Sequence, residues 1–583
     1  MKQILPFLSV FILCTIFLGE VTSAQKDSTK LNQSVEVMKA YRPSIANANK
    51  INLLPVIEDT ARFSPEFVYS IESRPVISGF TASSIKPADV NKRYYQESGI
   101  GYLKLGAGTS NSVFGEFFIN LPESRAATFG LHLRHLSSDG QIKLREANLV
   151  DAPCSQNNAA IFGSVNIGNT ILSTDLSYDR DAMRYYGYPA SIPAKIDSLS
   201  SHRYGLKQVY ERGALKVALR SSDQMKHDFT FNSGIRLGFF DSKTGQKENS
   251  AGLFGKFDYN FGMVHGVVNA SYDHFTTDSV TLDSQHISGT TGRDWIRIAP
   301  SLMLDGDSWA LRGGLNFVTV TNKNGGNITK LYPDFEFNYR PVSILTLYAA
   351  FKGDLKNNSY QDIAIENPWS DPRHNLQPTD FNYTVSGGLK GKMSREISYN
   401  IGVNHSKIND LYFYVLNSYL NAGSAPLYYS NQFGVEYGNA TVTNFSAEFS
   451  YVSGKDLSII LKGNYYNYSL EKLTVASHKP NFDLSATLGL RIIDNLTGYA
   501  DLGVIGSRQA RVININPFAS PVSHDEVVQI DPSVQLNFGA TYELTSKFRL
   551  FGRVDNVLNR LNEQWLGYAS QGLRLIAGVS VSF

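Results

Sequence analysis

The sequence has 583 residues, and charged residues make up 18% of it, below the roughly 25% that is typical of soluble domains. Glycine (47), phenylalanine (34) and tyrosine (32) are abundant, which is typical of β-rich proteins. The formal net charge of +2 and the lack of a Lys/Arg run argue against a nucleic-acid partner. One of the two cysteines lies in a predicted export signal, so a disulfide framework is excluded.

Residues 1–24 are predicted to be a signal peptide. Lys2 provides a positive start, Leu5 to Leu18 an apolar core, and Thr22-Ser23-Ala24 a cleavage site of small residues. The apolar core is shorter than the roughly 20 residues that a membrane-spanning helix needs. We therefore expect an exported protein whose mature chain starts at Gln25.

Residues 25–97 are predicted to be an extended N-terminal arm, periplasmic or lumenal, rather than a folded domain. Prolines recur in it at intervals of about ten residues, which prevents long helices; they are Pro43, Pro55, Pro65, Pro75 and Pro87. Short apolar clusters lie between them, for example at 35–41 and 51–57. We expect part of the arm to pack on a surface, either a lumen wall or a partner.

From residue 98 to Phe583 the sequence alternates apolar and polar residues with a period of 2, which predicts β-strands. In 482–492, for example, Phe482, Leu484 and Leu488 share one face, and Asp483 and Arg491 lie on the other. Strands of this length cross a bilayer at a tilt, with the apolar face toward lipid. The predicted fold is all-β: a transmembrane antiparallel β-barrel at 98–583.

The turns separate this hypothesis from a soluble β-sandwich or β-helix, whose strands also alternate. Tight connections, such as Gly168-Asn169, Arg340-Pro341 and Asp494-Asn495, alternate with long ones, such as 355–378 and 510–526. Short periplasmic turns opposite long external loops are typical of outer-membrane barrels. The alternation predicts about 22 strands, with 395–417 and 427–453 each forming one long strand.

The segment from Phe548 to Phe583 resembles the closing hairpin of TonB-dependent outer-membrane receptors. It contains Val554-Asp555-Asn556-Val557-Leu558-Asn559, a loop with Trp565 and Tyr568, and a final alternating strand. The resemblance implies a receptor-like barrel of about 22 strands in the outer membrane. It also implies that Val579, Val581 and Phe583 belong to the signal that the barrel insertion machinery recognises. An Asn367-Pro368-Trp369 stretch is similar to a recurrent pattern of receptor-like barrels.

The sequence departs from that family ahead of the barrel. Such receptors carry a folded plug of well over a hundred residues, whereas the arm at 25–97 is too short and too rich in proline for a complete plug. Within the arm, Val35, Glu36 and Val37 resemble the short box that lends a strand to TonB, a form of strand addition. The alternative is a strand tucked into the lumen, and the sequence leaves both open.

No motif for catalysis, a cofactor or a metal stands in a supporting context, and we expect no enzyme. Histidines such as His132, His265 and His405 are scattered rather than spaced as ligands. Two functional hypotheses remain. One is reception or transport of an unidentified ligand through loops such as 181–203 and 355–378. The other is a structural or assembly subunit of an outer-membrane complex without active import. Expected partners are outer-membrane lipid, the insertion machinery, and TonB or another envelope protein.

Overall fold

The computed structural model describes residues 100–583, all of which belong to one compact unit. Gaps within that range fall at 125–126, 145–148, 188–206, 223–227, 244, 263, 279–280, 283–284, 287–290, 323–325, 372–375, 420–431, 455 and 516–522. The predicted signal peptide and arm lie outside the described residues, so their boundaries stay predictions.

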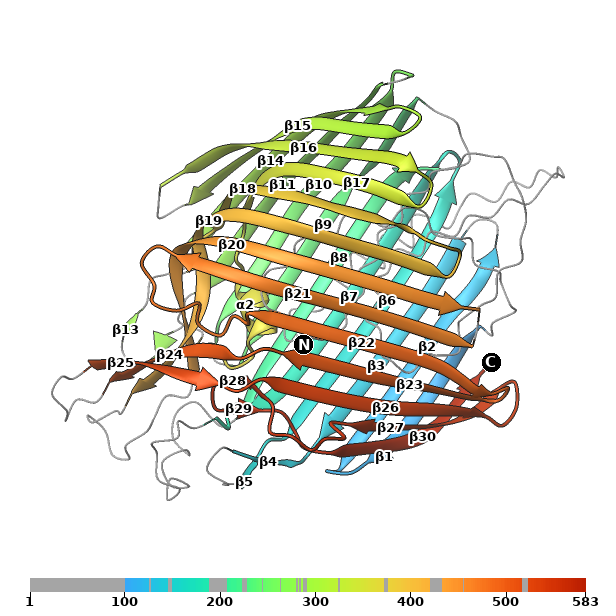
Figure 1. The fold of residues 1–583 in the computed structure, drawn as a ribbon, viewed down its shortest axis with the longest axis vertical. Coiled ribbons are helices and arrows are strands. Elements are labelled where there is room, and N and C mark those ends of the chain that lie inside the picture. Colours follow the sequence, from blue (N-terminus) through green and yellow to red (C-terminus); the bar gives the residue numbers. More distant parts are fainter. Residues whose placement is uncertain are drawn as a thin grey trace, which may run out of the picture. The chain divides into compact units, whose positions relative to one another are not determined.

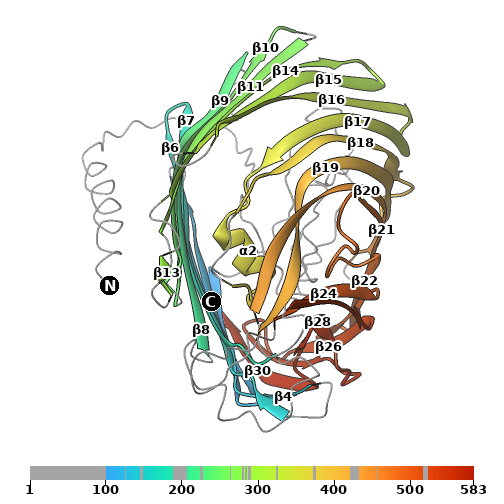
Figure 2. The same ribbon diagram turned by 90° about the vertical axis from the view of Figure 1, so that its left-hand side faces the viewer.

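The chain forms a closed antiparallel ring of 22 strands, which confirms the predicted fold and strand number. Figures 1 and 2 show these strands lying side by side around an interior. In the order of pairing they are β1 (Gly101–Gly108), β2 (Ser112–Ser124), β3 (Ala127–Ser138), β6 (Cys154–Ile167), β7 (Thr170–Arg184), β8 (Lys207–Ser221), β9 (Phe229–Ser242), β10 (Lys247–Asn260), β11 (Val264–Asp278), β14 (Thr291–Asp305), β15 (Trp309–Asn322), β16 (Ile328–Val342), β17 (Leu345–Lys356), β18 (Thr379–Lys392), β19 (Ile397–Tyr419), β20 (Gln432–Ser453), β21 (Leu457–Leu470), β22 (Phe482–Ile493), β23 (Leu496–Ile505), β26 (Ser533–Glu543), β27 (Phe548–Asp555) and β30 (Arg574–Ser582).

The ring closes where the first strand meets the last. β1 pairs with β30, with Leu103 opposite Val581 and Leu105 opposite Val579. Reciprocal hydrogen bonds of 3.0 Å join the backbone groups of Gly101 and Phe583. The closure leaves no free edge in the ring, which is what hydrocarbon requires of a β-sheet.

Further elements lie in the connections between ring strands. They are α2 (Tyr360–Glu366) and the hairpins β4–β5 (Gln141–Lys143 and Leu149–Asp151), β12–β13 (Thr281–Leu282 and Gln285–His286), β24–β25 (Arg508–Ile515 and Ser523–Ile530) and β28–β29 (Glu563–Trp565 and Tyr568–Ala569). Every one of them lies on the side of the long connections.

The predicted alternation of short and long connections is confirmed, with two corrections. The turn predicted at Arg340-Pro341 lies at 343–344, because a register shift after Tyr339 lets β16 continue to Val342. The predicted long loop at 510–526 is wrong in part. Its flanks form the β24–β25 hairpin, and β24 pairs in parallel with the end of β19.

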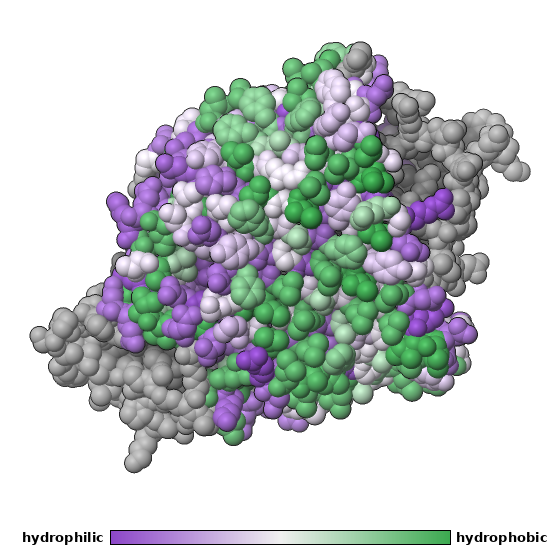
Figure 3. Space-filling model, viewed as in Figure 1, coloured by the Kyte–Doolittle hydropathy of each residue, from purple (hydrophilic) through white to green (hydrophobic). Residues whose placement is uncertain are grey.

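The two faces of the strands differ in chemistry, as β16 shows. Leu331, Phe335 and Phe337 on its outer face are 61%, 48% and 43% exposed. Asp334 and Glu336 on its inner face form ion pairs with Arg312 and Lys352 of the neighbouring strands. Figure 3 shows apolar side chains spread over the outer surface of the strands at the front. The outer face therefore suits lipid, and ion pairs line the lumen.

Replacing Phe583 by Asp is expected to lower the amount of protein in the outer membrane. The ring of Phe583 stacks on Phe117 at a centroid distance of 6.2 Å, and its side chain is 42% exposed. The aspartate removes both the aromatic end of the predicted insertion signal and this contact. Immunoblots of outer-membrane fractions, with unheated and boiled samples compared for the fast-migrating folded barrel, measure the effect.

The matched control is Phe583→Tyr, which keeps a terminal aromatic ring and is expected to reach the normal level. Equal amounts of the aspartate and tyrosine variants in the membrane would contradict the predicted role of this residue.

Candidate functional site

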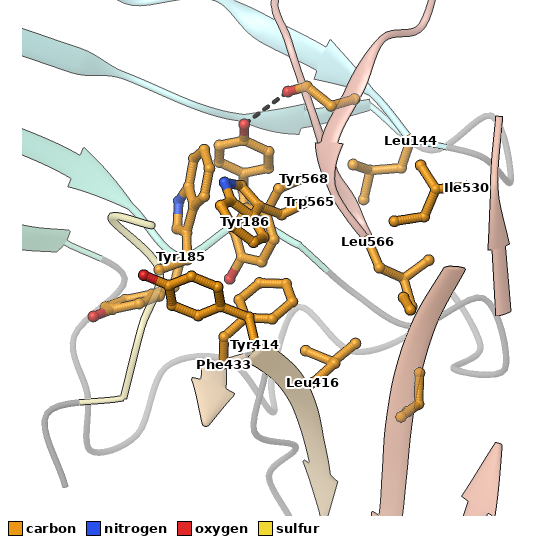
Figure 4. Packing of buried hydrophobic residues seen from close by; sticks show 14 of the residues in the cluster. Leu144, Tyr185, Tyr186, Tyr414, Leu416, Phe433, Ile530, Trp565, Leu566 and Tyr568 are labelled. Atoms are coloured by element: carbon orange, nitrogen blue, oxygen red, sulfur yellow. Dashed lines mark hydrogen bonds between the residues drawn. The ribbon is translucent and has the colours of Figure 1, made fainter. Parts of the chain in front are cut away.

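The long connections fold together at one end of the barrel around a cluster of buried apolar side chains, which we call the outer cap. Figure 4 shows part of this cluster. Its members are Ile142, Leu144, Ala152, Tyr185, Tyr186, Ile363, Trp369, Leu376, Tyr412, Tyr414, Leu416, Phe433, Ala510, Val512, Ile530, Trp565, Leu566, Tyr568 and Ala569.

The outer cap draws on five connections and on the ends of the two longest strands. β19 and β20 extend as single strands, as predicted, and their ends contribute Tyr414 and Phe433, both fully buried. Figure 2 shows these ends curving across the interior toward β28. The outer cap is therefore packed like a soluble protein core, although it lies at the mouth of a barrel.

Stacked aromatic rings join the connections to one another. Trp369, from the β17–β18 connection, stacks on Tyr568 with centroids 4.3 Å apart and rings 25° from parallel. Tyr186, from the β7–β8 connection, lies 5.1 Å from Tyr568 and donates a hydrogen bond of 2.7 Å to the carbonyl of Ala569. The indole N–H of Trp369 donates to the carbonyl of Arg184 at 3.1 Å. Three connections are thereby held in contact.

The helix α2 positions one charged side chain of the outer cap. Its start is fixed by a capping box, in which the Ser359 hydroxyl accepts from the Asp362 backbone N–H at 3.0 Å and the Asp362 carboxylate accepts from that of Ser359. Tyr414 donates to the carbonyl of Ile363 at 3.2 Å. These contacts place Glu366, at the end of α2, inside the outer cap.

Glu366 forms an ion pair with Lys479 that is almost completely buried. Their side chains are 4% and 5% exposed, and the ammonium lies 3.1 Å from the carboxylate. Tyr412 donates a further hydrogen bond to Glu366, and the Lys479 ammonium lies 5.2 Å from the centre of the Tyr412 ring. A buried charge pair of this kind stabilises only the arrangement in which both partners meet, so it specifies how the β17–β18 and β21–β22 connections dock.

Arg508, at the start of β24, is the largest fully buried side chain. It donates to the carbonyls of Gln564 at 2.7 Å and Glu563 at 2.6 Å, and to the Ser533 hydroxyl at 3.0 Å. Burial lowers the pKa of its guanidinium to about 10, so it stays charged at neutral pH. It ties the β24–β25 hairpin to the β27–β30 connection.

His478 is completely buried beside Lys479, between the rings of Phe433 and Trp565. Its Nδ1 lies 3.0 Å from the carbonyl of Tyr414, and its Nε2 accepts from the backbone N–H of Leu566 at 3.5 Å. These partners fit a neutral ring with its proton on Nδ1. Burial, together with the nearby charges of Arg508 and Lys479, lowers the pKa of His478 to about 3, although the bond to the Tyr414 carbonyl acts in the opposite direction.

The sequence-predicted site residues fall in two places. Val35, Glu36 and Val37 lie outside the described residues, so their predicted contact with TonB stays a prediction. Val579 and Val581 lie in β30, and Phe583 follows it, at the closure of the ring. Their role as an insertion signal also stays a prediction. Val579, Val581 and Phe583 do not belong to the outer cap.

Parts of the outer cap stand out in the sequence, but not the fact that they meet. Trp369, Trp565 and Tyr568 are family-like features there, and 355–378 is a candidate ligand loop. Glu366, Lys479, His478 and Arg508 do not stand out, because a buried charge in a long loop has the same local sequence signature as an exposed one.

Within the described residues, no group of three or more His, Cys, Asp or Glu side chains could hold a metal ion. Three of the scattered histidines bond neighbouring side chains: His132 bonds Glu116, His274 bonds Asp294 and His405 bonds Thr443. None of the helices in the part of the chain that the structure describes is long and apolar enough to cross a membrane.

The fold is similar to solved structures of outer-membrane receptors. The pyoverdine receptor FpvA from Pseudomonas aeruginosa is 13% identical, with a TM-score of 0.61 over 84% of this chain and 80% of that one. The iron transporter FrpB from Neisseria meningitidis is 11% identical, with a TM-score of 0.61 over 84% and 82%. The siderophore receptor PirA from Acinetobacter baumannii is 11% identical, with a TM-score of 0.62 over 84% and 81%. No family model and no curated protein matches the sequence.

At sequence identities this low, the structural similarity establishes the fold alone. The barrel has the architecture of TonB-dependent siderophore receptors, which confirms the resemblance seen in its last hairpin. The closed ring with its apolar outer face places the protein in the outer membrane. The proteins it resembles in structure are transport receptors, not enzymes.

Replacing Lys479 by Met is expected to destabilise the packed β21–β22 connection by about 3 to 5 kcal/mol, because it leaves the Glu366 carboxylate buried without its cation. Hydrogen exchange of the backbone amides in 471–481, such as that of His478, which bonds the Gln509 carbonyl at 2.7 Å, measures the free energy of local opening.

The paired control adds Glu366→Gln to the first change. It removes the unpaired charge, so most of the lost protection is expected to return. Normal protection in Lys479→Met alone would show that the ion pair does not hold the connection.

The β21–β22 connection is also expected to loosen in acid. The pKa of His478 in the packed state, about 3, lies below its value in an exposed chain, about 6.5. The stability that depends on a neutral His478 is present above about pH 6.5 and falls as the pH decreases toward 3, by up to about 1.4 kcal/mol per pH unit. Hydrogen exchange corrected for intrinsic rates, at pH 7 and pH 4.5, measures the fall.

His478→Asn is the control, since asparagine tolerates the positive φ of 63° found at this position. It is expected to weaken the connection at neutral pH and to reduce the difference between the two pH values. The same pH dependence in both proteins would assign the effect to other groups.

Proposed function

We propose that this protein is a gated outer-membrane receptor that admits an unidentified ligand into its barrel. The outer cap carries this proposal, because a core built from five long connections and the ends of β19 and β20 lies at the mouth of a wide barrel with a polar lumen wall. A wide barrel without such cover would breach the permeability barrier. The similarity in fold to siderophore and iron receptors supports a transport role.

The arrangement of the outer cap is suited to opening in one cooperative step. Its buried ion pair, the Arg508 contacts and the stacked rings each join different connections, so separating one connection exposes groups that belong to its neighbours. A ligand that binds the open arrangement more tightly than the closed one would shift this equilibrium. Coupling to TonB through Val35, Glu36 and Val37 is part of the proposal, with strand addition as its mechanism.

Removing both stacked rings, by Trp369→Ala with Tyr568→Ala, is expected to loosen the outer cap. Each large-to-small change of a buried aromatic residue costs about 3 to 5 kcal/mol, and these two rings join the β17–β18 and β27–β30 connections. Single-channel recordings in planar bilayers should show frequent, larger conductance steps than the unchanged protein gives. Cells should become sensitive to large antibiotics.

The matched control is Trp309→Ala, which removes a tryptophan that is 41% exposed at the start of β15. It is expected to leave conductance unchanged. Unchanged conductance in the double variant, with loss of a co-purifying envelope protein, would instead support a structural or assembly subunit. Unchanged conductance and unchanged partners would contradict gating by the outer cap.

A further inference from the structure

The outer surface of the barrel contains an apolar groove over β10, β11, β14, β15 and β16. Its volume is about 790 Å³, within the roughly 300 to 1,000 Å³ found for sites of small ligands. The side chains and backbone that line it are those of Phe229, Phe257, Asp258, Tyr259, Phe261, Gly266, Val267, Val268, Pro300, Ser301, Leu302, Leu304, Leu311, Gly313, Gly314, Leu315 and Phe335.

Missing side chains create the floor of the groove. Gly266 and Gly313 share the outer face with exposed leucine and valine residues of the same strands, Val268 and Leu311 among them. A methyl group added at Gly313 would touch only the Phe335 ring, at 3.4 Å or more. At Gly266 an added methyl group would meet the Phe261 ring at 3.2 Å, so the missing side chain there lets this ring lie close to the strand. Gly313 leaves a depression where the rest of the outer face carries side chains.

Two prolines lie on the strands that flank β15, close to Gly313. Pro333 of β16 pairs with Leu315 of β15, and the position of Pro300 in β14 falls opposite Leu315 on its other side. The pairing of β14 with β15 is interrupted between Ile298 and Ser301, because proline has no N–H to donate. Short, rigid rings here replace the long side chains that would otherwise fill the depression.

Aromatic side chains form the rim of the groove toward the short turns. Phe257, Tyr259 and Phe261 are 40%, 44% and 67% exposed, and Phe335 on the opposite side is 48% exposed. Large apolar rings that stay exposed are stable only against another apolar phase. The groove is continuous with the lipid-facing surface of the same strands, so the membrane itself covers it.

The groove lies in the half of the barrel next to the short turns. β10 ends at Asn260, β14 ends at Asp305 and β15 begins at Trp309, each within a few residues of lining positions. Short turns mark the periplasmic side of such barrels. The adjoining leaflet is the phospholipid leaflet of the outer membrane.

We propose that this groove is a lipid-binding site that holds one acyl chain of a phospholipid from the periplasmic leaflet. An apolar depression of this volume on a lipid-facing surface fits a flexible hydrocarbon chain, whereas a protein partner needs a broad interface of about 800 Å² on each side. The bound acyl chain makes close van der Waals contacts with the exposed rings and with the glycines, which their own strands do not provide.

Native mass spectrometry of the full barrel, released from detergent micelles after extensive washing, tests the site. The unchanged protein is expected to retain a single phospholipid when palmitoyl-oleoyl phosphatidylethanolamine is supplied. Gly313→Leu and Gly266→Leu, tested separately, fill the floor and are expected to weaken retention about tenfold, the effect of excluding about two methylene groups. Heat-modifiable migration verifies that each variant is folded.

The control is Gly552→Leu, which adds the same side chain to β27 on the outer face that Leu550 shares, where nothing lies within 4 Å of the added carbon. It is expected to retain lipid normally. Three results would overturn the proposal. The unchanged protein could carry no phospholipid, or detergent alone. Both groove variants could retain phospholipid as well as the unchanged protein does. The control could lose as much phospholipid as the groove variants do. The first needs no variant, so the proposal stays testable if a leucine prevents folding.

Discussion

Backbone hydrogen bonding in hydrocarbon is the constraint on which the rest of this structure depends, because lipid offers no partner for an N–H or C=O group. A strand at an open edge would leave a row of such groups unpaired, so the sheet has to close. β1 and β30 provide the closure, and the bonds between Gly101 and Phe583 complete it at the chain's own end. The polar lumen and the apolar outer face follow from the period of 2 once the ring is closed.

Ring closure creates a second requirement, since a barrel of 22 strands encloses a wide interior. In the gated receptor that we propose, the outer cap meets that requirement at the mouth. The long connections contribute buried aromatic residues, and charged residues such as Glu366, Lys479 and Arg508 whose partners come from other connections. A core assembled from so many segments is costly to open partly, which suits the gated receptor that we propose.

The outer wall and the outer cap differ in how their side chains fill space. In the outer cap, large side chains fill the space and exclude water. In the groove over β14 and β15, glycine and proline leave space that lipid fills. Each kind of packing suits its surroundings, because the outer cap faces water and the barrel wall faces hydrocarbon.

The sequence by itself determined the barrel, its strand number, its two faces and the single long strands β19 and β20, because a period of 2 and the spacing of turns are local properties. It placed the turn after β16 three residues early, because a register shift depends on the neighbouring strand. Only the tertiary structure decided that the flanks of 510–526 form a hairpin beside β19, and that Trp369 meets Tyr568 and Glu366 meets Lys479. These residues lie far apart along the chain, and what brings them together is the closure of the ring, which no local pattern encodes.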